Sequence, residues 1–365
     1  MFASLRFGTP VVLLGALAAP LPVDACAVAP PRDAVVEVAS ESAIIVWDER
    51  AKTEHFIRRA TFAAAAPGRV PVKDFGFLVP TPSVPALEES ADTAFDDLAK
   101  LTAPKTETRP LPTGGGCAIG CGAMAPAARP ATDGHTVEVL AVKSVAGYDA
   151  QVLKAADADA LAAWLKDHGY DSRPALAAWL KPYVEKKWVV TAFKISTSAA
   201  AASAPVGSGT VRMSFNTDAP VYPYREPDDL VEAKGGRVLR LFFVADQKVA
   251  GALDGGAAWG ANTAWAGKPG AEGWKGVVPH LKLPGWAPGE GTWLTEFEDR
   301  ASTRKGKSDL TFKAAADQTP KERPTRIVYA ARTDAGPAPA LAMIAAAPAC
   351  LYATRFLTRL AGRRG

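Results

Sequence analysis

Two closely spaced cysteines are the first candidates for chemistry. Cys117 and Cys121 lie in the segment Thr113-Gly-Gly-Gly-Cys-Ala-Ile-Gly-Cys-Gly122. Redox-active pairs are separated by two residues, and a zinc site needs two further soft or imidazole ligands, for which His135 is the near candidate. We therefore expect a local disulfide or two free thiols. A role in thiol redox chemistry or metal binding through this pair stays an alternative.

Four carboxylates are the second candidates, for acid-catalysed hydrolysis. Glu296, Glu298 and Asp299 lie close together in the sequence, and Asp74 follows the basic residue Lys73 far upstream. Paired-acid catalysis needs two carboxyl groups about 5–10 Å apart. A hydrolase in which these side chains converge in the fold is therefore the second functional hypothesis.

The acidic cluster at 92–97 is expected to be structural. The segment Ser90–Leu101 has the spacing of a short amphipathic helix, with Phe95 and Leu98 on one face. Its aspartates are Asp92, Asp96 and Asp97. Negative charge near the start of a helix is favoured by the helix dipole, so the pattern indicates a helix in preference to a metal site.

The histidines and the motif search indicate no catalytic centre. The four histidines, His55, His135, His168 and His280, are scattered singly. No pair has the spacing that places two imidazoles on one helical face, and no nucleophile elbow, phosphate-binding loop or dinucleotide-binding motif occurs. The sequence therefore predicts no catalytic residue, no metal ligand and no cofactor, and it favours a protein that is not an enzyme.

Tryptophan is the most distinctive feature of the segment 259–293. The segment is rich in glycine and proline, so little regular structure is expected in it. Its indoles are Trp259, Trp265, Trp274, Trp286 and Trp293. The first four could form a platform for sugar rings or peptide, because a rigid aromatic gives contact area at low entropic cost. The alternative, which we favour, is that they pack loops against a sheet.

The elements that must position these residues are mostly strands. Runs rich in β-branched and aromatic residues predict strands at 35–46, 55–62, 75–79, 135–142, 188–195, 211–215, 238–244, 292–297 and 326–330. Two amphipathic helices are predicted at Asp157–His168 and Ser172–Lys187. Because the strands do not alternate regularly with helices, we expect an α+β fold. It would have mainly antiparallel sheets, a central helix pair and Gly/Pro-rich insertions.

The first 25 residues have the organisation of a secretory signal peptide. Arg6 precedes an apolar run from Val11 to Leu21, and Val23-Asp24-Ala25 is a small-residue cleavage pattern. The run is too short for a stable membrane anchor. Cys26 follows directly, so acylation of Cys26 is an alternative to ordinary cleavage.

The predicted organisation has five parts. Residues 1–25 are the signal peptide, 26–101 a β-rich part of a globular domain, 102–134 an insertion or linker, 135–330 the α+β remainder and 331–365 an apolar segment with a basic tail. The net charge is only +4 and four arginines lie in the last eleven positions, so no nucleic-acid partner is expected.

The C-terminal segment 335–354 carries no charged residue and is followed by Arg355, Arg359, Arg363 and Arg364. It is long enough to cross a bilayer, and the arginines fit a cytoplasmic tail. It is also mostly alanine and contains Pro337, Pro339 and Pro348, which disfavour a spanning helix. The segment is therefore either a membrane anchor or a buried or amphipathic C-terminal helix, in which case Cys350 is a core thiol.

Several motifs in a fixed order resemble one bacterial family. They are Asp74-Phe-Gly-Phe-Leu-Val-Pro-Thr-Pro82, Gly147-Tyr-Asp-Ala-Gln-Val-Leu153, Asp159-Ala-Leu-Ala-Ala-Trp-Leu165, Val189-Val-Thr-Ala-Phe-Lys194, Val211-Arg-Met-Ser-Phe215 and Pro220-Val-Tyr-Pro223. Together they resemble exported bacterial proteins grouped as domain of unknown function 2330, over residues 25–312. The resemblance implies an envelope protein and carries over no activity, cofactor or catalytic residue.

These observations lead to one expectation about function. We expect an exported protein of the periplasm or cell envelope, with a binding or structural role toward an unknown envelope ligand or protein. Membrane contact would run through 335–354. The hydrolase and the thiol or metal-binding protein remain the alternatives.

Overall fold

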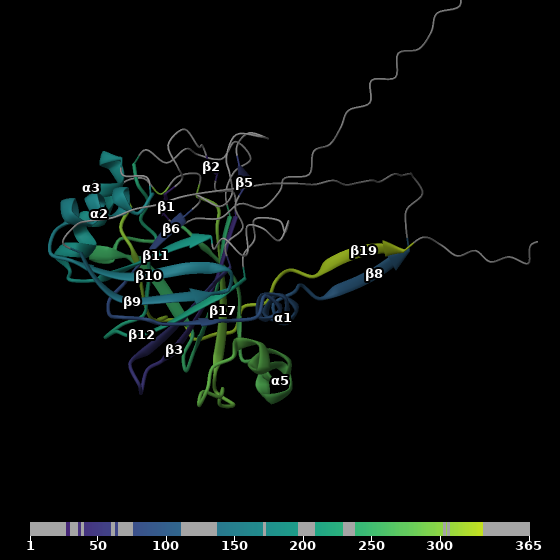
Figure 1. Cartoon of the computed structure of the whole chain (residues 1–365). Helices are drawn as coiled ribbons and strands as arrows, with labels where there is room; N and C mark the ends of the chain where they lie inside the picture. Colours follow the sequence, from purple (N-terminus) through teal and green to yellow (C-terminus); the bar gives the residue numbers. More distant parts are fainter. Residues whose placement is uncertain are drawn as a thin grey trace, which may run out of the picture. The chain divides into compact units, whose positions relative to one another are not determined.

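The computed structural model describes the chain between residues 27 and 330, with gaps (Figure 1). The described residues are 27–29, 36–37, 40–59, 63–64, 76–110, 137–170, 173–195, 209–228, 238–301, 304 and 307–330. The chain divides into a first unit, residues 1–104 with 120–324, and a second unit, residues 105–119 with 325–365. The predicted signal peptide, most of the predicted insertion and the C-terminal segment lie outside the described residues.

The largest sheet of the first unit has seven strands. Their order is β16 (Asn262–Gly267), β17 (Trp293–Asp299), β14 (Val238–Ala245), β3 (Ser40–Asp48), β4 (Thr53–Arg59), β12 (Val211–Asn216) and β7 (Ala86–Glu89). Neighbouring strands are antiparallel except β14 and β3, which run parallel. The predicted strand at 238–244 and residues 40–46 of the predicted strand at 35–46 therefore lie at the centre of this sheet, whereas residues 36–37 belong to another strand, β2.

A second sheet of five antiparallel strands belongs to the same unit. Its order is β1 (Ala27–Ala29), β6 (Gly76–Thr81), β11 (Val189–Ile195), β10 (Tyr148–Ala155) and β9 (Val137–Val145). Three further strands, β13 (Val221–Tyr222), β18 (Leu310–Ala314) and β15 (Val249–Leu253), form a small sheet, and β2 (Val36–Glu37) pairs with β5 (Ala63–Ala64). The mainly antiparallel α+β fold is thus confirmed.

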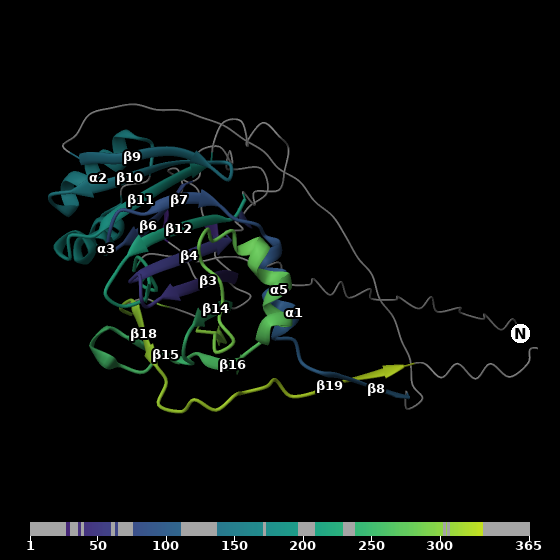
Figure 2. The ribbon, with the colours of Figure 1, turned by 90° about the horizontal axis from the view of Figure 1, so that it is seen from below.

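Helices cover the outer face of each large sheet (Figure 2). The predicted pair, α2 (Ala158–Asp167) and α3 (Pro174–Glu185), packs on the five-stranded sheet. The helices α1 (Thr93–Leu101) and α5 (Gly270–Leu281) pack on the seven-stranded sheet. A short 3-10 turn, η2 (Asp254–Gly256), follows β15. The first unit therefore has a layer of helices on each outer side and the sheets between them.

Strand alternation divides the hydrophobic core into three clusters. Along β3, Ala43 and Ile45 face the inner core between the sheets, whereas Ile44 and Val46 face α1 and α5. On β6, Phe77 faces the inner core. We call the cluster between the seven-stranded sheet and these two helices the helix-side core; it includes Ile44, Val46, Phe95 and Trp274. Because side chains alternate with period two, the inner strands of the two large sheets bury side chains on both faces.

The helix α5 was not predicted, because its sequence contains Gly270, Gly273, Gly276 and Pro279. These residues are poor helix formers. The helix forms because Trp274 and Val277, one helical turn apart, are buried in the helix-side core. The expectation of little regular structure in the tryptophan-rich segment is therefore wrong, since β16 and α5 both lie in it.

The second unit contains two described strands, β8 (Thr106–Pro110) and β19 (Arg326–Ala330), which pair in parallel. The predicted strand at 326–330 is therefore present, and its partner comes from the segment predicted as an insertion. The large side chains of Ile327, Val328 and Tyr329 are exposed. Within the described part of the chain, no helix has the length and apolar character needed to cross a membrane.

Candidate functional site

The four tryptophans of the predicted platform are divided between two faces of the seven-stranded sheet. Trp259 packs against the inner core, with its ring centroid 5.2 Å from that of Phe297. Trp274 is buried in the helix-side core, and Trp265 and Trp286 pack against the same cluster. The fold therefore does not gather the four indoles on one surface.

The predicted carboxylates of β17 also lie on two faces. Glu296 and Glu298 both contact the guanidinium of Arg323, whose Nη2 lies 2.8 Å and 2.6 Å from their Oε1 atoms. Asp299, one residue further, points to the opposite face and accepts a hydrogen bond from Tyr224. Burial raises the pKa of Glu298, but the hydrogen bond and charge of Arg323 outweigh it and hold this pKa below its usual value.

Several predicted residues lie outside the described residues. They are Cys26, Asp74, Cys117, Cys121, His135 and Cys350. The thiol, acylation and paired-acid hypotheses that depend on them stay predictions. Within the part of the chain that the structure describes, no group of three His, Cys, Asp or Glu side chains is arranged to hold a metal ion.

The acidic cluster of α1 forms ion pairs with neighbouring elements. The Asp97 carboxylate accepts a hydrogen bond from Lys100 at 2.7 Å, and its other oxygen lies 2.6 Å from Nδ1 of His280 on α5. Asp96 pairs with Arg59 of β4 at 3.7 Å. The hydrogen bond from Lys100, aided by that from His280, holds the pKa of Asp97 below its usual value. These contacts link α1 to α5 and to the sheet.

Four charged side chains form a buried ion cluster at one end of the inner core. Glu41 of β3 is bridged by two guanidiniums, with its Oε1 3.4 Å from Nε of Arg58 and its Oε2 3.1 Å from Nη1 of Arg304. The same Nη1 lies 4.0 Å from a carboxylate oxygen of Glu226. None of the four is more than 4% exposed. The cluster balances two positive with two negative charges.

Aromatic side chains complete this cluster. The guanidinium of Arg304 lies 4.4 Å from the ring centroid of Tyr224, whose hydroxyl donates to Asp299 at 2.6 Å. Trp259 Nε1 donates to the same carboxylate oxygen at 3.2 Å. Burial opposes the charge of Arg304, but the carboxylates of Glu41 and Glu226 outweigh it and raise its pKa. The guanidinium therefore stays charged at neutral pH. A group that keeps its charge is suited to stabilising the fold and not to transferring protons.

A histidine and a serine from neighbouring strands meet on the helix-side face of the seven-stranded sheet. Nδ1 of His55 on β4 lies 2.8 Å from Oγ of Ser214, its cross-strand partner on β12. Burial, followed by the charge of Arg212, lowers the pKa of His55 to about 4. A neutral imidazole beside a serine is half of a nucleophilic system. Among the described residues, His55 has no second hydrogen-bond partner to orient it, so the pair falls short of a catalytic triad.

The lowered pKa of His55 predicts a pH dependence of stability. The unfolded state binds a proton below about pH 6.5 and the folded state only below about pH 4, so this contribution is complete above pH 6.5 and is lost as the pH falls toward 4. The loss is expected to reach about 2–3 kcal/mol, after allowance for the partial exposure of the ring.

Urea unfolding of wild type and His55→Asn at a series of pH values between 7 and 4 measures this loss. The wild type is expected to lose more stability over this range than the variant. Equal pH profiles for the two proteins would contradict the assignment.

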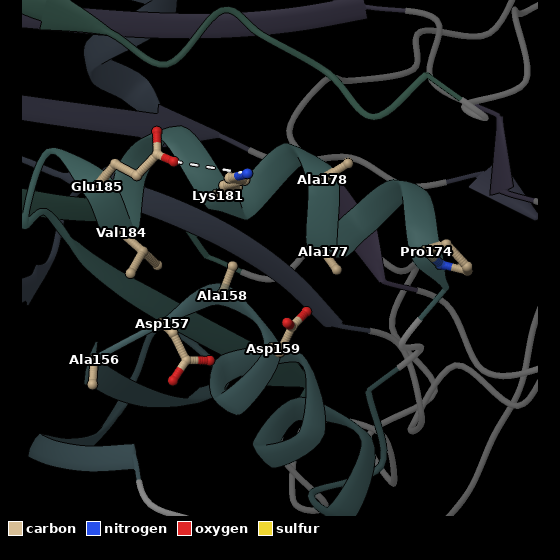
Figure 3. A pocket seen from close by; sticks show the side chains of 10 residues that line it. All are labelled: Ala156, Asp157, Ala158, Asp159, Pro174, Ala177, Ala178, Lys181, Val184 and Glu185. Carbon is tan, nitrogen blue, oxygen red and sulfur yellow. Dashed lines mark ion pairs between the residues drawn. The ribbon is translucent and has the colours of Figure 1, made fainter.

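A cavity lies between α2 and α3, on the outer side of the five-stranded sheet (Figure 3). Its volume is about 600 Å³. Small side chains make most of its wall: Ala156, Ala158, Ala177, Ala178 and Pro174, with Val184. Figure 3 shows Ala177 and Val184 projecting from α3 toward α2. The alanine side chains leave space between the two helices that larger side chains would fill.

Charged side chains surround this groove unequally. Its lining includes three carboxylates, Asp157, Asp159 and Glu185, and one lysine, Lys181, whose Nζ lies 4.0 Å from Glu185. Asp157 is partly used, since its carboxylate accepts a hydrogen bond from the backbone N–H of Ala160 at 2.7 Å and caps α2. The residues that line the groove therefore carry more negative than positive charge, and the remaining lining is apolar. Such a groove suits a ligand that has both cationic and apolar groups.

Sequence reasoning missed the buried ion cluster, the His55–Ser214 pair and the groove. Each brings together residues from separate elements. His55 and Ser214 are 159 positions apart, and Glu41 and Arg304 are 263 apart. The one available signal was the run of alanines on the two predicted helices, which indicates a groove only once the two helices are known to be neighbours.

A family model described as "Uncharacterized protein conserved in bacteria (DUF2330)" matches residues 22–362. No curated protein and no solved structure matches the chain. The matched range includes every strand and helix described above.

Proposed function

The chain belongs to the DUF2330 family of uncharacterised bacterial proteins, and we propose that it is an exported protein of the cell envelope that acts by binding and not by catalysis. The signal-peptide pattern of residues 1–25 supports export. The ion pairs that hold Glu296, Glu298 and the buried ion cluster support a role without acid catalysis. In this proposal the apolar segment 335–354 contacts the membrane.

The observation that carries the binding function is the groove between α2 and α3. Its volume of about 600 Å³ lies within the range typical of ligand sites. A groove between two helices accepts an amphipathic helix, whose apolar side enters the groove while its charged residues meet the rim. Because Asp159 and Glu185 add negative charge to this rim, the expected ligand is a basic amphipathic segment of another envelope protein.

Peptide binding to the protein recovered from the cell-envelope fraction tests this function. The expected mass of that protein corresponds to an N-terminus at Cys26, with an added mass if Cys26 is acylated. The probe is a synthetic amphipathic helix with alanine and leucine on one face and lysine on the other. The double variant Asp159→Asn/Glu185→Gln is expected to bind it about fivefold to tenfold more weakly at low ionic strength, because two surface charge contacts are lost.

Two controls make the result specific. Glu49→Gln/Glu290→Gln also removes two exposed carboxylates but lies outside the groove, so it should bind the peptide like the wild type. Raising the salt concentration should reduce the difference between the variants. The proposal fails if a peptide with glutamate in place of lysine binds equally well, or if both double variants behave alike.

A further inference from the structure

The strand β9 is an exposed edge of the five-stranded sheet (Figures 1 and 2). It is nine residues long, and among the described strands its only pairing partner is β10. Most of its side chains are exposed, on both faces of the strand. Val139 is 40% exposed and Val142 is 70% exposed. A long edge strand with exposed valines is a site where another strand can add.

The sequence of this edge is self-complementary. An uncharged run, Val139-Leu-Ala-Val142, is flanked by Glu138 on one side and Lys143 on the other. When two copies of the strand run antiparallel about a centre between Leu140 and Ala141, each Glu138 lies opposite a lysine and each Val139 lies opposite a valine. Opposite charges and apolar pairs in directly opposed positions stabilise antiparallel strands.

A β-bulge makes this register geometrically consistent. Ala141 pairs with Val152 of β10 and Val139 pairs with the next residue, so Leu140 is the extra residue. On β10, Ala150, Val152 and Lys154 share a face, and their partners Lys143, Ala141 and Glu138 therefore share a face as well. Without the bulge, Glu138 and Lys143 would point to opposite sides, because they are five positions apart, which is an odd number.

We infer that β9 pairs with β9 of a second copy of this chain, forming a two-fold symmetric dimer with a sheet continuous across it. A two-fold axis perpendicular to the sheet keeps each residue on its own face, so opposed residues must share a face, as Glu138 and the partner's Lys143 do. Symmetry forms each contact twice. The inference goes beyond the proposed function and does not depend on the groove.

The present contact of Lys143 leaves this residue able to pair with a second copy. Nζ of Lys143 donates to the backbone oxygen of Leu87 on β7 at 2.6 Å. An ammonium has three donors, so two are left for a carboxylate of the second copy. A second copy fits this edge better than an unrelated strand, because one sequence supplies both the acid and the base in the required register.

Charge exchange between the two positions tests the dimer. Sedimentation equilibrium of the wild type is expected to show a monomer–dimer equilibrium. Glu138→Lys and Lys143→Glu each place like charges opposite one another twice, so each is expected to weaken self-association at least about tenfold. The double variant, Glu138→Lys/Lys143→Glu, restores both pairs and should associate like the wild type.

Mixing the two single variants is the decisive measurement. One copy then carries two lysines and the other two glutamates, so both contacts become attractive and a mixed dimer is expected. Thermal unfolding monitors whether each variant is folded. A wild type that stays monomeric at high concentration would overturn the inference, and so would single variants that associate unchanged or a mixture that does not associate. Association of the wild type with unrelated strand peptides at equal affinity would also overturn it.

Discussion

Replacing Arg304 by methionine is expected to lower the free energy of unfolding by about 3–5 kcal/mol, the usual cost of removing one partner from a buried ion pair. The Arg304 side chain is 2% exposed and lies 3.1 Å from Glu41 and 4.0 Å from Glu226. Methionine keeps much of the volume but removes the positive charge that lies beside both buried carboxylates. Urea unfolding followed by circular dichroism at pH 7 measures the loss.

Arg300→Met is the matched control, because the same chemical change is made four positions away on the surface. The Arg300 side chain is 69% exposed and pairs with Glu298 at 3.2 Å. Its replacement is expected to change stability by no more than about 0.5 kcal/mol. If Arg304→Met cost less than about 1 kcal/mol, the result would contradict a stabilising role of Arg304 in the buried ion cluster.

The position of Arg304 shows where sequence reasoning ends. The residue lies in Ser302-Thr-Arg-Lys-Gly-Lys-Ser308, whose charge and glycine are typical of a solvated loop. Nothing in the local pattern distinguishes its buried guanidinium from the neighbouring lysines. The partner carboxylate on β3 is 263 residues away, so only the folded arrangement identifies the pair.

The fold itself was more accessible from the sequence than the sites. On α3, Leu176 and Trp179 recur with helical spacing and both are buried, so local periodicity was sufficient to predict the helix. On α5, Gly276 and Pro279 hide a similar periodicity, and the helix depends on burial of its neighbouring side chains in the helix-side core. The helix and strand propensities of the residues predict an element well where tertiary packing favours the same structure. They miss an element, such as α5, that only tertiary packing stabilises.

The groove and the edge strand depend on the arrangement of elements in space. The sequence predicted both helices and the strand at 135–142, but it did not show that Val184 and Ala158 line one groove or that β9 lies at a sheet edge. The order of strands in a sheet is set by pairing between distant parts of the chain. An edge strand can have the same alternation of apolar and polar residues as an inner strand of a sheet that has one face in solvent. The candidate sites were therefore out of reach of residue patterns.

Replacing Trp274 by alanine is expected to lower the free energy of unfolding by about 3–5 kcal/mol, as for other large aromatic residues in cores. The side chain is 2% exposed and packs in the helix-side core with Phe95, Val277 and Leu294. Alanine leaves a cavity between α5 and the sheet that the surrounding strands cannot fill. Urea unfolding measures the change, and loss of α5 should appear as reduced helical circular dichroism.

Trp274→Phe separates packing from the platform hypothesis. Among the described residues, the indole Nε1 has no hydrogen-bond partner, so phenylalanine removes volume without breaking a hydrogen bond and should cost only about 1–2 kcal/mol. A residue of a ligand platform would behave in the opposite way, because its replacement by alanine would weaken binding while leaving stability nearly unchanged. A loss below about 1 kcal/mol in Trp274→Ala would therefore contradict the packing role and favour the platform. A graded loss from phenylalanine to alanine would assign this indole to the core.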